Sequence, residues 1–105
     1  MRATAWNNGS HKASGAGYGL RISQKDRDRL FDPRWREVVF DLGGEAEATA
    51  VPSESFWRSC SELRSAEIGR WLRRHNLAPW PNGRPPAFEV RQLSENRFAI
   101  DLPER

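Results

Sequence analysis

Two segments of this 105-residue chain carry the side chains best suited to chemistry, and the first lies near the N-terminus. Residues 14–19 read Ser-Gly-Ala-Gly-Tyr-Gly, and His11 and Lys12 stand just before them. Residues without side chains let backbone amides approach an oxyanion, and the histidine and lysine would add charge and proton transfer. This pattern predicts contact with phosphate. The alternative is a hairpin loop whose glycines occupy turn positions.

Nucleotide cofactors and metal ions are not indicated. The glycine-rich segment precedes a strand rather than a helix, and it lacks both the Gly-Lys-Ser/Thr of a P-loop and the spacing of a dinucleotide fingerprint. The chain has one cysteine and two histidines, and its carboxylates are scattered without metal-ligand spacing. We therefore expect neither a cofactor nor a bound metal.

The second segment, residues 66–75, predicts a helix with one cationic face. Helical spacing places its apolar residues and His75 on one side and Arg70, Arg73 and Arg74 on the other. Such a face can lie along a nucleic-acid backbone, where each neutralised phosphate adds affinity that falls with salt. The alternative is a solvated face on which Arg70 pairs with the glutamate three residues before it.

Five further residues are candidates for nucleic-acid contact. Lys25, Arg27 and Arg29 lie on a predicted short helix, and they would broaden the cationic patch if the two helices share a face. Arg21 points outward from a predicted strand. Trp80 stands between prolines, where its ring would be held outward, and exposed aromatics among arginines are the usual stacking surface for single strands.

Cys60 is the obvious nucleophile, but its surroundings argue against catalysis. It falls between Phe56 and Leu63 at i+4 and i+7 spacing, on the apolar stripe of a predicted helix. A free cysteine in such a place is usually an inert small hydrophobe. We therefore expect a buried, unreactive thiol.

A ribonuclease site would need a general base and a cation beside the phosphate. His11 or Glu62 would be the base, and Arg21 or Arg70 the cation. The sequence does not fix their geometry, so an enzyme of this kind is the least favoured function.

Short strands and helices must position these groups. Alternation of apolar and polar residues predicts strands over 18–22, 35–42 and 45–51 and a hairpin that turns at 94–96. Helical spacing and capping residues predict helices over 25–31, 54–64 and 66–75. Residues 7–17 predict a flexible Gly/Ser-rich loop, and residues 79–86 a stiff proline-rich connector.

These elements predict one α+β domain over residues 1–105. Its strands are joined by short turns, so we expect a small antiparallel sheet or open barrel with a central pair of helices and a C-terminal β-hairpin. No apolar run exceeds three residues, as in Val38–Phe40, and a membrane helix needs about 20. A membrane span is therefore excluded. A chain of 105 residues can bury one modest core but not two, so a second domain is excluded as well.

The charge is unevenly distributed along the chain. Residues 1–36 carry 8 basic and 3 acidic groups, residues 37–67 carry 2 and 7, and residues 68–105 carry 7 and 4. Fifteen of the 17 basic residues are arginine, whose planar fork suits phosphate and guanine edges. Basic ends around an acidic middle favour a nucleic-acid partner.

The leading hypothesis is a cytoplasmic module that binds DNA or RNA through arginine–phosphate contacts, as an accessory of a larger assembly. A single cysteine and the lack of a secretory segment favour the cytoplasm. A protein-interaction module, inhibitor-like or antitoxin-like, is the first alternative, using the acidic segment and Trp80. A small ribonuclease is the second. The sequence does not indicate the oligomeric state.

Overall fold

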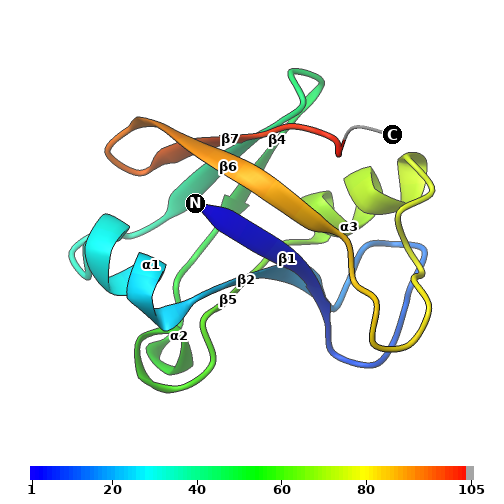
Figure 1. Ribbon diagram of the computed structural model, residues 1–105, viewed down its shortest axis with the longest axis horizontal. Helices are drawn as coiled ribbons and strands as arrows, with labels where there is room; N and C mark the ends of the chain where they lie inside the picture. Colours follow the sequence, from blue (N-terminus) through cyan, green and yellow to red (C-terminus); the bar gives the residue numbers. More distant parts are fainter. Residues whose placement is uncertain (104–105) are drawn as a thin grey trace.

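The computed structural model describes residues 1–103, in which seven strands and three short helices form (Figure 1). The elements are, in chain order, β1 (Arg2–Asn7), β2 (Tyr18–Ile22), α1 (Gln24–Leu30), β3 (Val38–Leu42), β4 (Ala46–Ala50), α2 (Glu54–Arg58), β5 (Glu62–Arg64), α3 (Ala66–Arg74), β6 (Ala87–Ser94) and β7 (Arg97–Ile100). The strands form one mixed sheet in the order β4-β3-β7-β6-β1-β2-β5. The sheet curls into a nearly closed barrel, which confirms the predicted α+β class, the open barrel and the C-terminal hairpin.

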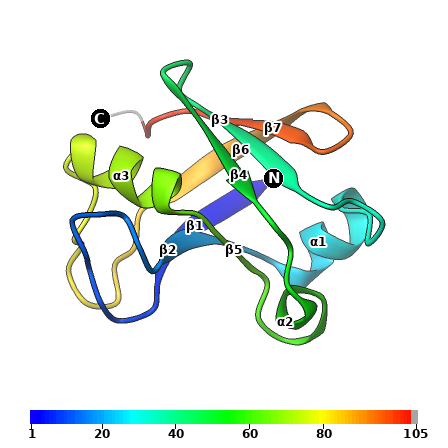
Figure 2. The same cartoon turned by 180° about the vertical axis from the view of Figure 1, so that it is seen from behind.

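The helices cover the two ends of the barrel. α1 and α2 lie together at one end and α3 lies at the other, as the front and back views agree (Figures 1 and 2). Leu20 and Ile22 of β2 are fully buried while Arg21 between them is exposed, as the alternation predicts. Phe31, which follows α1, stacks on Phe98 with 5.0 Å between ring centroids. The barrel interior is therefore the hydrophobic core, and polar function must lie on its outer face or at its ends.

One strand pair departs from the predicted antiparallel pattern. β3 and β7 pair in parallel, with Phe40 opposite Phe98. The C-terminal hairpin places β7 beside β3, and the two strands are far apart in sequence. Turn residues specify local antiparallel partners only, so they gave no signal for this pair.

The predicted helix over 54–64 is wrong in its second half. α2 ends at Arg58, and residues 62–64 form β5, whose Leu63 pairs with Leu20 of β2. The Ser61 hydroxyl donates to the Ile22 carbonyl at the start of this pairing. A strand here satisfies the backbone edge of β2, which a continued helix would leave unpaired. Cys60 is consequently exposed rather than buried, so the expected apolar environment of its thiol is wrong.

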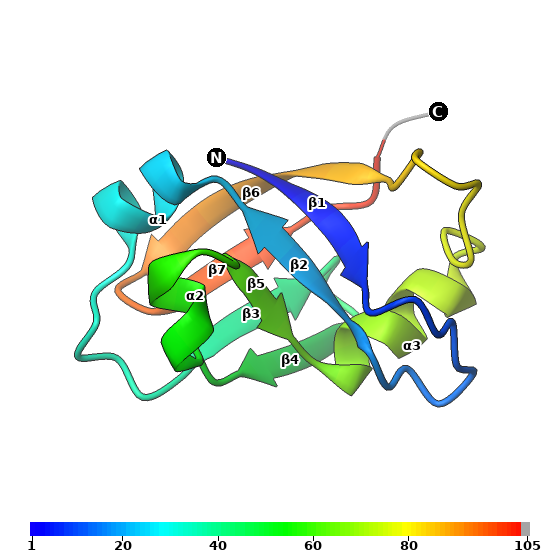
Figure 3. The ribbon, with the colours of Figure 1, turned by 90° about the horizontal axis from the view of Figure 1, so that it is seen from below.

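Two further differences follow from β5 and from the N-terminus. The predicted central pair of helices is separated by β5, and its members α2 and α3 cover opposite ends of the barrel (Figure 3). β1, which lies between β6 and β2, was not predicted, because the only side chains it buries fully are the small ones of Ala3 and Ala5. Within residues 1–103 the longest helix has nine residues, so none is long and apolar enough to cross a bilayer.

Candidate nucleic-acid interface

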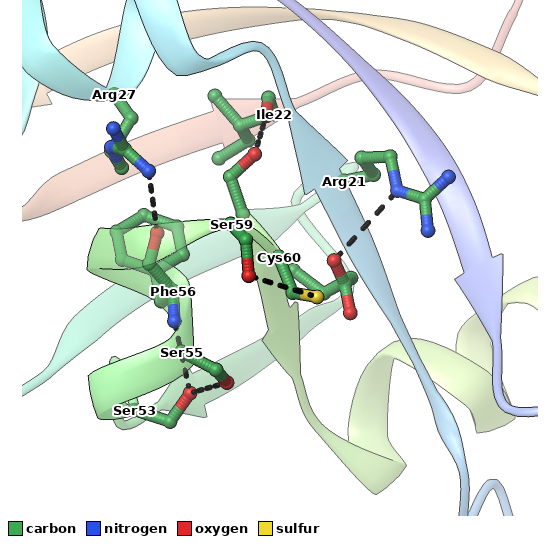
Figure 4. Close-up of polar contacts among 10 residues, drawn as sticks. Arg21, Ile22, Arg27, Ser53, Ser55, Phe56, Ser59 and Cys60 are labelled. Atoms are coloured by element: carbon green, nitrogen blue, oxygen red, sulfur yellow. Dashed lines mark hydrogen bonds and ion pairs between the residues drawn. The ribbon is translucent and has the colours of Figure 1, made fainter.

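The basic residues predicted from the two helices do not share a face. Lys25, Arg27 and Arg29 lie on α1, at the barrel end opposite α3 (Figures 1 and 3). Arg27 is buried, and its guanidinium donates to the Phe56 carbonyl oxygen at 2.8 Å (Figure 4). It also donates to Asp28 at 2.9 Å. Arg27 therefore ties α1 to α2, and its predicted exposure to a ligand is wrong.

The remaining cations of α1 are exposed but do not form a patch with α3. Arg29 pairs with Asp26 one turn earlier at 2.9 Å, and Lys25 has no hydrogen-bond or ion-pair partner within residues 1–103. An exposed pair of this kind is worth little energy and offers no concentrated positive field. The broader two-helix patch is therefore absent from the described part of the chain.

A different basic surface lies on the outside of β1, β2 and β5, which Figure 3 shows together. We call it the sheet face and define it by Arg2, Trp6, Arg21 and Arg64. The strand register places Thr4, Arg21 and Glu62 in one row across the three strands, and Trp6, Gly19 and Arg64 in the next. Side chains in register on one face of a sheet are neighbours, so Arg21 and Arg64 lie in adjacent rows.

Arg21 lies beside a buried carboxylate. Its Nε is 3.8 Å from Oε2 of Glu62, an ion pair without a hydrogen bond (Figure 4). The Glu62 side chain is only 5% exposed, whereas the Arg21 side chain is 59% exposed. The two terminal amino groups of Arg21 have no partner among residues 1–103, so they are available for bidentate contact with phosphate or a guanine edge.

Arg64 lies over the Trp6 ring, with its central carbon 4.7 Å from the ring centroid. The residue between them in the register is Gly19, at which a Cβ would overlap the Leu63 carbonyl oxygen. Glycine is therefore required where the arginine and the tryptophan meet. Arg64 is exposed and has no carboxylate partner in the described chain, so its charge remains available.

Basic residues outnumber acidic ones on the three strands of the sheet face. β1, β2 and β5 carry three arginines and one carboxylate, the buried Glu62. The next strand, β6, places Glu89 opposite Arg2. The local excess of positive charge is therefore centred on Arg21 and Arg64, where it favours an anionic ligand.

A second group of predicted residues meets at the α3 end of the barrel, beyond the sheet face. We call His11, Tyr18, Arg73 and Trp80 the loop cluster. Nδ1 of His11 lies 2.7 Å from the Tyr18 hydroxyl oxygen, and the rings of His11 and Trp80 meet edge to face at 4.9 Å. Arg73 donates to the same hydroxyl at 3.5 Å and to the His11 carbonyl oxygen at 3.4 Å. Trp80 is half-buried against these rings, so its predicted outward projection is wrong.

The loop between β1 and β2 is fastened to α3. Gly15 packs on Gly69, where a Cβ would lie 2.5 Å from the Gly15 carbonyl oxygen. Arg70 donates to the Ser14 carbonyl oxygen at 2.8 Å and also pairs with Glu67, as the sequence alternative anticipated. Arg70 therefore holds the loop in place, while Lys12, exposed on the loop, has no partner in the described residues.

Arg74 belongs to neither group. It lies 3.5 Å from Glu45 in the β3–β4 turn, and His75 hydrogen-bonds to the same carboxylate. The hydrogen bond from His75, with help from Arg74, lowers the pKa of Glu45. Arg74 thus pairs with a carboxylate of the β3–β4 turn, away from the sheet face.

The fold brings only some of the base and cation pairs expected for a ribonuclease close together. Glu62 does lie beside Arg21, but the carboxylate is buried beneath the guanidinium. The cation in contact with the loop residue His11 is Arg73, not Arg70. Within residues 1–103 no group of three or more His, Cys, Asp and Glu side chains is placed to hold a metal ion.

Sequence reasoning missed Arg2, Trp6 and Arg64 as members of the interface. Arg64 was assigned to a helix, and the strand that holds Arg2 and Trp6 was not predicted. The alternation of alanines with longer side chains in β1 was the available signal.

Comparison of the chain with known protein families, with curated proteins and with solved structures finds no match.

Proposed function

We propose that this protein binds DNA or RNA by contacting the phosphate backbone with the arginines of the sheet face, as an accessory module of a larger assembly. The support is the excess of arginine on three adjacent strands, where Arg2, Arg21 and Arg64 are exposed. An exposed, unpaired cysteine is compatible with a reducing compartment, and we propose the cytoplasm.

One observation carries the proposal: buried Glu62 pairs with Nε of exposed Arg21 and leaves both terminal amino groups of the guanidinium without a partner among residues 1–103. The terminal amino groups of an ordinary surface arginine either pair with a neighbouring carboxylate or are free to move, in which case the side chain loses conformational entropy when it binds a ligand. Arg21 is positioned before a ligand arrives. Arg64, which lies over the Trp6 ring, is restrained in a similar way.

The binding measurement is fluorescence anisotropy of labelled duplex and single-stranded DNA and RNA over a series of salt concentrations. We expect binding at low salt, with an affinity that falls linearly on logarithmic axes. Arg21→Ala and Arg64→Ala should each weaken binding and reduce the salt slope by about 1, which is the loss of one phosphate contact.

The matched control is Arg34→Ala, which removes the same charge. Arg34 is 88% exposed and pairs with Asp32 in the segment between α1 and β3, away from the sheet face. We expect this variant to retain the wild-type affinity and slope. If the protein binds no oligonucleotide at low salt, or if all three variants lose affinity equally, the sheet face is not the interface.

The two alternative functions gain no specific support. Trp80, the proposed anchor for a protein partner, is packed on His11 and Tyr18. Gel analysis of the RNA recovered from the binding experiment tests the ribonuclease directly, because RNA cut by the wild type and not by His11→Ala would favour that function over simple binding.

A further inference from the structure

We infer that the loop cluster, with the neighbouring Lys12, is a phosphate subsite in which Nε2 of His11, Arg73 and Lys12 contact one phosphodiester of the bound nucleic acid. This inference rests on the proposed function and extends it to the α3 end of the barrel. It also predicts a property that the sheet face lacks, namely that binding is coupled to the uptake of a proton.

The first step is the orientation of the His11 ring. An arginine N–H can only donate, so the Tyr18 oxygen accepts the bond from Arg73 and has its own O–H available for Nδ1 of His11, 2.7 Å away. In that arrangement the neutral imidazole carries its proton on Nε2. The edge contact with Trp80 holds the ring plane. His11 is exposed, and Nε2 has no partner within residues 1–103, so it is a positioned donor for an anionic oxygen.

The second step is the charge around the ring. Arg73 of α3 contacts the Tyr18 hydroxyl and the His11 carbonyl oxygen, and Tyr18 of β2 contacts the ring itself. Trp80, from the connector, carries no charge. Lys12 adjoins it in the loop. The nearest carboxylate of α3, Glu67, is occupied by Arg70. The described groups that face His11 are therefore neutral or positive, which favours an anion over a cationic or neutral ligand.

The third step couples binding to protonation. A proton added at Nδ1 makes this nitrogen a donor to the Tyr18 oxygen and places a second positive charge beside Arg73. A phosphate at Nε2 stabilises that positive charge, so the complex takes up a proton more readily than the free protein does. Histidine is the side chain that changes charge between about pH 5 and 8, so affinity should rise as the pH falls through this range.

The experiment measures oligonucleotide affinity between pH 8.5 and 5.5 at constant ionic strength, for the wild type, His11→Gln and His75→Gln. The uptake of one proton strengthens binding by at most about tenfold per pH unit. We expect this rise in the wild type and in His75→Gln, and a flat profile in His11→Gln. His75 is the matched control because it is the only other histidine and hydrogen-bonds to Glu45 instead.

A second measurement keeps the subsite testable if nucleic-acid binding fails. Addition of inorganic phosphate is followed by the ring signals of both histidines in NMR spectra, assigned with the two variants. We expect the His11 signal to move and the His75 signal to stay.

The outcomes separate the two proposals. Phosphate that moves the His11 signal, without oligonucleotide binding at any pH, would retain the subsite and overturn the proposed function. Oligonucleotide binding that depends on Arg21 and Arg64, with the same pH profile in His11→Gln as in the wild type, would retain the proposed function and overturn the subsite. Absence of both the His11 shift and oligonucleotide binding would overturn both proposals.

Discussion

Gly15 and Gly69 pack backbone against backbone, so that a Cβ on Gly69 would lie 2.5 Å from the carbonyl oxygen and 2.6 Å from the Cα of Gly15. This contact fixes the β1–β2 loop on α3 and places His11 near Arg73. The glycine of α3 is thus part of the support for the proposed phosphate subsite.

Gly69→Ala should destabilise the protein, against the usual trend. Alanine in a helix interior is ordinarily favoured over glycine by about 1 kcal/mol. Here the added methyl group collides with Gly15 and with the buried Tyr18 ring. Overpacking of this kind costs about 1–3 kcal/mol, so we expect a net loss in urea unfolding. An increase in stability would show that the β1–β2 loop can move away from α3 at little cost in free energy.

Glu62→Gln should weaken nucleic-acid binding even though it makes the protein more positive. If only net charge mattered, removal of one carboxylate would strengthen binding. Loss of the ion pair instead leaves the Arg21 guanidinium free to move, so the side chain loses more conformational entropy when it binds the nucleic acid. Anisotropy at fixed salt measures the sign of the change. Stronger binding by Glu62→Gln would contradict the orienting role of the carboxylate.

Arg27→Ala should lower stability rather than act selectively on binding. The side chain is buried, and its loss leaves the Phe56 carbonyl oxygen without this donor. Removal of a hydrogen bond to a charged group costs about 1.5–3 kcal/mol. Arg29→Ala, which removes an exposed arginine from the same helix, is the control and should change the unfolding free energy by less than about 0.5 kcal/mol.

Asp32 should make stability depend on pH in acid. Its hydrogen bond from the Arg34 side chain, followed by one from the Arg34 backbone amide, lowers the pKa of the carboxyl from 3.8 to about 2. Because the folded-state pKa is depressed, this stabilisation is present above the unfolded value and is lost as the pH falls toward 2.

Urea unfolding of the wild type and Arg34→Ala tests this dependence. The difference in unfolding free energy should be constant from about pH 7 to 5 and shrink as the pH falls toward 2. A difference that persists unchanged at the acid limit would show that Arg34 acts through contacts other than the Asp32 carboxylate.

Local patterns predicted most of the secondary structure. The strands β2, β3 and β4 and the C-terminal hairpin follow from alternation and turn residues, and Ser23 caps α1 through its hydrogen bond to the Asp26 amide. Asn76, which follows the last helix, takes the left-handed conformation that asparagine tolerates, with φ of 58°. These features are determined by residues close together in the sequence, so local sequence patterns are enough to predict them.

The remaining features depend on contacts between distant segments. Residues 62–64 form a strand because the edge of β2 is available, and helical spacing of Phe56 and Leu63 cannot reveal that competition. The candidate site shows the same limit. His11, Arg73 and Trp80 were each identified from residue type, but their meeting at Tyr18 requires the folded barrel. Arg64 was missed because its partner Trp6 lies on a strand that the sequence did not reveal.

The barrel is not fully closed, so its sheet ends in β4 on one side and β5 on the other. An unpaired strand edge is a template on which a second chain can add a strand. β5 has only three residues, enclosed in the sequence between α2 and α3. A chain that docked along β5 would gain few backbone hydrogen bonds before meeting a helix. Because this strand is so short, it disfavours edge-to-edge aggregation at this side of the sheet.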